Sequence, residues 1–158
     1  MDLSLLRRFL LPGPSDRILF SGCYLLVATS LNLLWELAQL PFYTIWRDSP
    51  IRDSLLAAVH CTAGDVIIAA LVLVCAVLLM GRNWPQDNYL KVAVLTVILG
   101  VAYTIFSEWL NVEVRRTWAY APAMLRLPWV GTGLAPLAQW IVIPSVAFFL
   151  LKRRASSR

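Results

Sequence analysis

Four apolar stretches, each long enough to cross a bilayer, constrain this chain more than any other feature of its sequence. Hydropathy places them at residues 18–40, 54–80, 90–110 and 134–151. A helix of about 20 residues crosses the roughly 30 Å hydrocarbon core of a membrane. Because lipid offers no hydrogen-bond partner to an exposed backbone, each stretch is predicted to be a helix. The chain is therefore predicted to be an all-α, integral membrane four-helix bundle.

The composition and the lack of linkers indicate one membrane domain. Hydrophobic residues make up 59% of the chain and charged residues 15%, against about 45–50% and about 25% in soluble domains. No Gly/Ser-rich or low-complexity segment divides the 158 residues. We therefore expect one four-span domain at residues 18–151, a cytoplasmic or interfacial tail at 1–17, and a basic cytoplasmic tail at 152–158.

The basic residues flank the apolar stretches, which is typical of membrane anchoring. The formal net charge of +5 is therefore not interpreted as a nucleic-acid surface, and no nucleic-acid partner is expected. Of the 14 Lys and Arg residues, nine fall on the side of the two termini. The positive-inside rule then predicts that both the N- and C-termini are cytoplasmic.

The polar residues of the four predicted helices fall at one depth. Successive helices run in opposite directions, and a rise of about 1.5 Å per residue still brings Glu36, His60, Asp65, Glu108 and Gln139 to the outer half. Asp65 lies about 16 Å below the outer end of its helix, close to the midplane. The inner half has small or weak hydrogen-bonding groups. This distribution predicts an outward-opening polar pocket above a closed apolar base.

Helical spacing predicts that two polar stripes face the interior of the bundle. Residues at i, i+4 and i+7 share one face of a helix. The stripes are Asn32, Glu36 and Gln39 on the first helix and Thr104, Glu108 and Asn111 on the third. The long loop at 112–131, which holds Trp118 and Tyr120, is predicted to fold as an aromatic-walled lid over this pocket.

Ionisable groups within membrane helices indicate a function, because each costs roughly 2.5–3.5 kcal/mol on insertion scales. We predict that Glu36, His60, Asp65 and Glu108 form a catalytic set that passes protons to and from a lipophilic small molecule. The reaction would be an isomerisation, hydration or cyclisation. The predicted substrate contacts are Asn32, Gln39, Asn111, Trp118, Tyr120, Gln139 and Trp140.

The same residues are compatible with other functional hypotheses, and the sequence does not decide whether the protein is an enzyme. The polar groups could hold helices together, or serve a non-enzymatic membrane subunit or assembly factor in a homodimer or membrane complex. A metal- or proton-handling role is a further alternative. One histidine supplies few nitrogen ligands, and Cys61 lies about 100° from His60 around the helix. We therefore assign no metal ligand, leave the cofactor unknown, and expect free thiols at Cys23, Cys61 and Cys75.

Five short segments between residues 30 and 144 carry a resemblance. They are Trp35-Glu36-x-x-Gln39-x-Pro41-x-Tyr43, His60-Cys61-Thr62-Ala63-Gly64-Asp65, Ser107-Glu108-Trp109-x-Asn111, Trp118-x-Tyr120 and Pro136-x-x-Gln139-Trp140. Together they resemble an uncharacterised family of small bacterial four-helix inner-membrane proteins. The resemblance implies a multi-pass protein of the cell inner membrane and no particular activity. A weaker likeness, of architecture alone, is to small membrane isomerases and cyclases that act on sterols or carotenoids.

Overall fold

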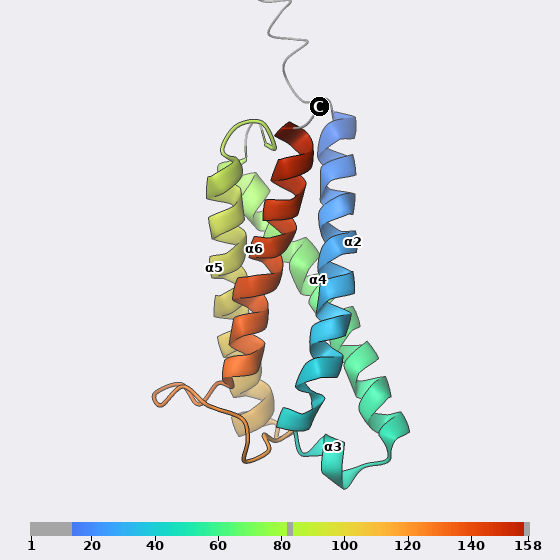
Figure 1. The fold of residues 1–158 in the computed structure, drawn as a ribbon. Helices are drawn as coiled ribbons and strands as arrows, with labels where there is room; N and C mark the ends of the chain where they lie inside the picture. Colours follow the sequence, from blue (N-terminus) through green and yellow to red (C-terminus); the bar gives the residue numbers. More distant parts are fainter. Residues whose placement is uncertain (1–13, 82–83, 157–158) are drawn as a thin grey trace, which may run out of the picture.

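A computed structural model describes residues 14–81 and 84–156 as a bundle of helices (Figure 1). Within this part of the chain there is no named strand, and the β-bridges are isolated. The predicted tail at 1–17 lies largely outside the described residues. The elements in chain order are α2 (Pro14–Gln39), η1 (Leu40–Phe42), α3 (Ile45–Asp48), α4 (Ile51–Met80), α5 (Tyr89–Glu108), η2 (Trp109–Val114) and α6 (Leu134–Ser156).

The predicted fold class, an all-α four-helix bundle, is confirmed. Four helical segments are long and apolar enough to cross a membrane, namely Arg17–Phe42, Ile51–Met80, Tyr89–Val114 and Leu134–Lys152. The observed helices extend a few residues beyond the predicted ranges. Helix α4 begins at Ile51 rather than at residue 54, with Pro50 at the cap position and no side-chain cap. Helix ends are where hydropathy is least informative.

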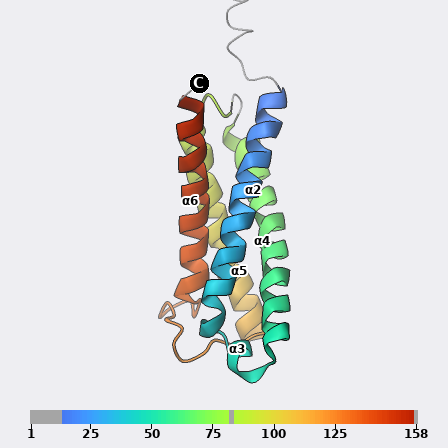
Figure 2. The same ribbon diagram turned by 45° about the vertical axis from the view of Figure 1, so that its right-hand side comes forward.

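The four long helices form a ring in the order α2, α4, α5, α6, and each packs mainly against its two neighbours (Figures 1 and 2). The beginning of α2 and the end of α6 lie at one end of the bundle. Helix α3 and the loop between η2 and α6 lie at the other end, which we call the α3 end. Figure 1 also shows α4 running away from α5 toward the α3 end.

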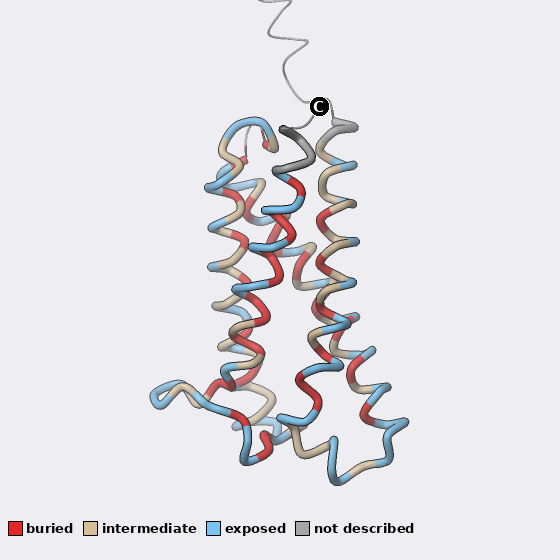
Figure 3. Tube along the Cα trace, viewed as in Figure 1, coloured by how far each residue is buried: buried red, intermediate tan, exposed pale blue. Residues whose placement is uncertain are grey.

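Large apolar side chains lie on the outside of the bundle and small polar ones inside, the reverse of a soluble protein and as contact with lipid requires. On the outside, Leu78 and Leu90 are 79% and 71% exposed. Figure 3 shows how buried and exposed positions alternate along the helices. Small polar side chains are inside, with Ser54 and Thr96 each 0% exposed. Thr96 satisfies its hydroxyl by donating to the carbonyl of Val92 at 2.8 Å. This is how a polar group is accommodated between membrane helices.

The apolar base predicted for one half of the bundle is present, but it contains more polar atoms than expected. The cluster packs Tyr24 against Phe148, with ring centroids 4.8 Å apart, and Phe20 edge-on against Trp84 at the same distance. Tyr24 and Trp84 are buried, and the Tyr24 hydroxyl and Trp84 indole N–H have no partner among the described residues. The expectation of only weak hydrogen-bonding groups here is therefore wrong for these two aromatic side chains.

A glycine sets the distance between α5 and α6 at the floor of the polar half. A Cβ atom placed on Gly100 would lie 2.3 Å from Cε3 of Trp140, far inside contact distance. The indole ring of Trp140 is buried and rigid, so it cannot move aside as a flexible side chain would. Gly100 therefore allows the tryptophan to pack flat against α5.

The substitution Gly100→Ala tests this packing. We expect it to destabilise the bundle by about 1–3 kcal/mol through overpacking, measured as thermal unfolding of the detergent-solubilised protein. The matched control is Gly22→Ala, because nothing lies within 4 Å of a Cβ added at Gly22. A helical Gly→Ala change without a clash gains about 0.5–1 kcal/mol. Equal stability of the two variants would contradict the packing.

Candidate functional site

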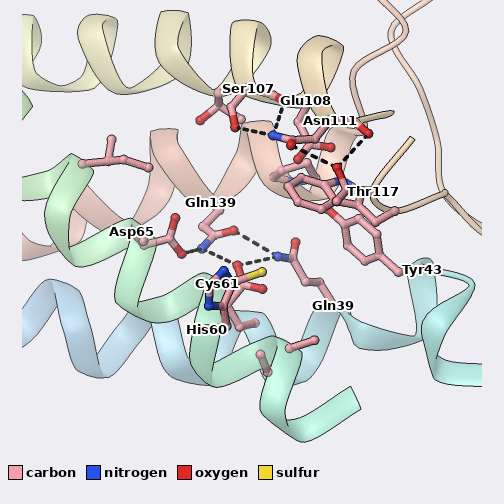
Figure 4. Close-up of a pocket in the computed structure, with 18 of the residues that line it drawn as sticks. Gln39, Tyr43, His60, Cys61, Asp65, Ser107, Glu108, Asn111, Thr117 and Gln139 are labelled. Carbon is pink, nitrogen blue, oxygen red and sulfur yellow. Dashed lines mark hydrogen bonds between the residues drawn. The ribbon is translucent and has the colours of Figure 1, made fainter. Parts of the chain in front are cut away.

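A cavity of about 500 Å³ lies in the half of the bundle toward the α3 end (Figure 4). Its volume is within the range of about 300–1,000 Å³ typical of small-molecule sites. Side chains from all four long helices and from the η2–α6 loop form its wall. They include nine of the eleven predicted site residues, which are Glu36, Gln39, His60, Asp65, Glu108, Asn111, Trp118, Gln139 and Trp140.

The side chain of Gln139 connects three helices at the centre of the bundle. Its Nε2 lies 2.9 Å from Asn32 Oδ1, 3.0 Å from Glu36 Oε1 and 2.9 Å from Asp65 Oδ2. An amide nitrogen has two hydrogens, so the three acceptors share two donated bonds. Gln139 is 2% exposed, and this polar contact from α6 to α2 and α4 is therefore shielded from solvent.

Glu36 and Asp65 are a pair of buried carboxyl groups, and both lie within hydrogen-bond distance of the same amide nitrogen of Gln139. Gln39 Nε2 donates to Glu36 Oε1 at 2.8 Å and to Gln139 Oε1 at 3.2 Å. Two carboxylates held this close together in a buried site repel each other, so one of the two groups holds a proton. The pair is therefore a shared-proton site. We refer to Asn32, Glu36, Gln39, Asp65 and Gln139 as the carboxyl–amide cluster.

Both predicted polar stripes face the interior, which confirms the reading of the helical period. Asn32, Glu36 and Gln39 are all buried along α2. On α5, Thr104 and Glu108 are buried and Asn111 is half-buried. The four antiparallel helices bring these stripes to the same level, so residues more than 100 positions apart in the chain come into contact.

Glu108 belongs to a second cluster that ties the loop to α5. The Tyr120 hydroxyl donates to the Glu108 carboxyl and accepts from the Gly133 backbone N–H at 2.9 Å. Burial raises the pKa of Tyr120 above its ordinary value, and the hydrogen bond to Glu108 raises it further, so the phenol keeps its proton. The indole N–H of Trp118 is buried and has no hydrogen-bond partner among the described residues.

The loop between η2 and α6 is folded, as the aromatic lid prediction requires. Thr44 N donates to Ala119 O at 3.0 Å and Ala121 N donates to Phe42 O at 2.9 Å, which joins the loop to the chain after η1. Trp118 reaches the cavity wall from this loop. Trp129, by contrast, is 83% exposed and takes no part in that wall.

The structure places two predicted contact residues behind the cavity wall. Asn32 supports Gln139, and Tyr120 supports Glu108, but neither lines the cavity. His60 does line it, from an exposed position, and no hydrogen bond joins its imidazole to a described residue. Cys61 lines the cavity beside His60, because the cavity spans a wide arc of α4.

Sequence reasoning missed part of the wall and one local feature of the backbone. Tyr43 and Tyr103 line the cavity, and neither was assigned to the site. Tyr43 lies after η1 and packs on Tyr120, with ring centroids 5.6 Å apart. The continuation of α5 as the π-helix η2 widens the helix directly after Glu108. Of these three features, only Tyr43 was indicated by the sequence, through the segment Pro41-x-Tyr43 directly after the end of α2.

The donor atoms of the site suit proton transfer and hydrogen bonding. In the described part of the chain, no group of three or more His, Cys, Asp or Glu side chains is close enough to share a metal ion. Cys23, Cys61 and Cys75 are free thiols. Acids, amides and phenols are what the cavity offers a ligand.

Comparison with known proteins leaves the function to be argued from the site. A scan against protein-family models finds no matching family, and searches of the curated proteins and of the solved structures find no match. The resemblance to a bacterial inner-membrane family therefore stays a prediction. Function has to follow from the geometry and chemistry of named residues.

The role of Gln139 is testable by removing its amide. Gln139→Leu keeps the volume but leaves oxygens of Asn32 and Asp65 without a buried donor. Glu36, by contrast, keeps the amide of Gln39. We expect a loss of about 1–3 kcal/mol of stability. The measurement is unfolding of the protein in mixed micelles by added SDS. Gln86→Leu, at an exposed loop position, is the control and should change stability by less than about 0.5 kcal/mol. Equal effects of the two changes would show that Gln139 does not hold the cluster.

Proposed function

We propose that this protein is a membrane enzyme that performs acid/base chemistry, of isomerase, hydratase or cyclase type, on a lipophilic small molecule held in the cavity. The observation that carries the proposal is the pair of buried carboxyl groups, Glu36 and Asp65, that share the amide of Gln139 on the wall of a ligand-sized cavity. Gly64 lines the same cavity, and nothing lies within 4 Å of a Cβ added there. The pair therefore has open space beside it for a substrate.

The carboxyl pair can act as acid and base in one turnover. The carboxyl group that holds the proton donates it to a double bond or hydroxyl of the substrate, and the partner carboxylate accepts a proton from a neighbouring carbon. The pair then has one proton again, so an isomerisation needs no other reactant. Gln39 and Gln139 hold the two groups in place through their amides. The Glu108 carboxyl and the faces of Tyr43 and Trp118 stabilise the positive charge that develops on the substrate.

A docking subunit would need its polar stripes on the outside, where a partner can reach them. The burial of Glu36, Asp65 and Glu108 supports an internal ligand over that alternative. The bacterial inner membrane is our proposed location, based on the resemblance of the five motifs. With cytoplasmic termini, as the Lys and Arg distribution predicts, the α3 end and the cavity lie toward the opposite side of the membrane.

Hydrogen exchange between solvent and lipid tests this proposal without a known substrate. The protein in nanodiscs is incubated in D₂O with a panel of sterols, carotenoids and polyisoprenoid alcohols, and mass spectrometry follows deuterium incorporation and product formation. We expect one lipid class to gain deuterium or change structure with the wild-type chain. Glu36→Gln and Asp65→Asn, which each remove one carboxyl of the pair, should reduce the rate by at least about 100-fold.

The matched control is Asp53→Asn, the same chemical change in the first turn of α4, at an exposed position away from the cavity. It should keep the wild-type rate. The proposal fails if the wild-type chain causes no deuterium incorporation and no product formation in any lipid tested, including lipids extracted from the cells in which the protein is expressed. It also fails if Asp65→Asn and Asp53→Asn behave alike.

A further inference from the structure

The cavity is rich in hydrogen-bond acceptors, most of them carboxyl and amide oxygens. Three carboxyl groups, those of Glu36, Asp65 and Glu108, line it, and no Lys or Arg side chain does. His60 is the one basic side chain among the described residues of the wall, and it is exposed, whereas the three carboxyl groups are buried. A ligand that satisfies such a site has to bring hydrogen-bond donors and positive charge.

An unsatisfied buried acceptor points to the same kind of ligand. Gln39 is 4% exposed, its Nε2 is used within the carboxyl–amide cluster, and its Oε1 has no partner among the described residues. Figure 4 shows this carboxamide beside that of Gln139, on the side toward Tyr43. Because a buried carbonyl oxygen without a donor is costly, a donor from a ligand is the expected partner.

Aromatic faces add to the preference for a cation. Tyr43, Tyr103, Trp118 and Trp140 all line the cavity. Ring faces attract an ammonium group that lies over them, and this attraction grows where water is excluded. Carboxyl groups and aromatic rings that line the same cavity therefore favour an ammonium head group.

The wall is incomplete on the side between α4 and α5. The wall residues on α2, namely Glu36, Gln39 and Leu40, are all buried. His60 on α4 and Tyr103 on α5 also line the cavity, yet both are exposed, and Tyr103 is 42% exposed. The two helices diverge toward the α3 end (Figure 1). The cavity therefore reaches the outer surface of the bundle between these two helices, at the level of the apolar surface.

We propose that the cavity binds a long-chain amine in its protonated, N–H-bearing form, which enters from the bilayer between α4 and α5. The head group donates to Gln39 Oε1 and to the carboxyl groups of Asp65 and Glu108. The alkyl chain leaves past Gly64 and Tyr103 into the lipid. Gly64 gives it room, because nothing lies within 4 Å of a Cβ added there.

This inference rests on the proposed function and names the ligand class of the same cavity. Protonation of a substrate carbon creates a positive charge in front of the carboxyl groups, and an ammonium group reproduces that charge in a stable molecule. Amine binding and lipid turnover are separate measurements. If the protein binds the amine but turns over no lipid, the proposed enzymatic function fails and the proposed ligand class stands. If it turns over a lipid but binds no amine, the ligand class fails and the enzymatic function stands.

The probe is tritiated dodecylamine, bound near neutral pH to the full chain in phosphatidylcholine nanodiscs, with empty nanodiscs as the background. We expect one saturable site per chain. Unlabelled 1-dodecanol, which lacks the charge, and dodecyltrimethylammonium, which lacks the N–H, should each compete at least about tenfold more weakly than unlabelled dodecylamine. Absence of a saturable site, or equal competition by either analogue, overturns the proposal.

Two glycine variants of the chain locate the site. Gly64→Phe fills the cavity beside the carboxyl pair and should abolish saturable binding. Gly22→Phe places the same ring at an exposed position of α2, where nothing lies within 4 Å, and should leave binding unchanged. Retained binding in Gly64→Phe overturns the proposal. The unfolding temperature of Gly64→Phe shows whether the variant is folded. If this temperature differs from that of the wild type, the variant is set aside and the competition series on the wild-type chain decides.

Discussion

The contact of one amide with three acceptors, at Gln139, is the interaction on which the rest of this structure depends. Inside a membrane no water is present to hydrogen-bond a polar group, so the side chains of Asn32, Glu36 and Asp65 require a hydrogen-bond partner within the protein. Gln139 supplies it from α6 and thereby joins α2 and α4 to α6. The polar groups of three helices therefore meet at one point, at the amide of Gln139.

The neighbouring residue links this contact to the apolar packing. Trp140 lies against Gly100 of α5 and belongs to the cluster that fills the other half of the bundle. Gln139 and Trp140 therefore place α6 against all three of the other long helices. The boundary between the polar cavity and the apolar base falls at this level. A ligand in the cavity then meets acids and amides, and the apolar cluster lies beneath it.

Hydropathy and helical period predicted the four helices, the inward stripes and most of the cavity wall, because those signals depend on spacing along one helix. They could not place Tyr120 or Asn32 behind the wall, since each position is set by a contact with another element. They could not foresee that His60 lies at an exposed edge, which follows from the divergence of α4 from α5. Nor does local composition indicate the π-helical turn after Glu108.

The proton shared by Glu36 and Asp65 is the central claim of this account, because both the stability of the cluster and the proposed chemistry need it. Infrared spectroscopy of the protein in nanodiscs near neutral pH measures it directly, through the C=O stretch of a protonated carboxyl group and its shift in D₂O. The account predicts one such band that both Glu36→Gln and Asp65→Asn remove, and that Asp53→Asn leaves in place. A wild-type spectrum without the band, or a band that survives Asp65→Asn, would contradict it.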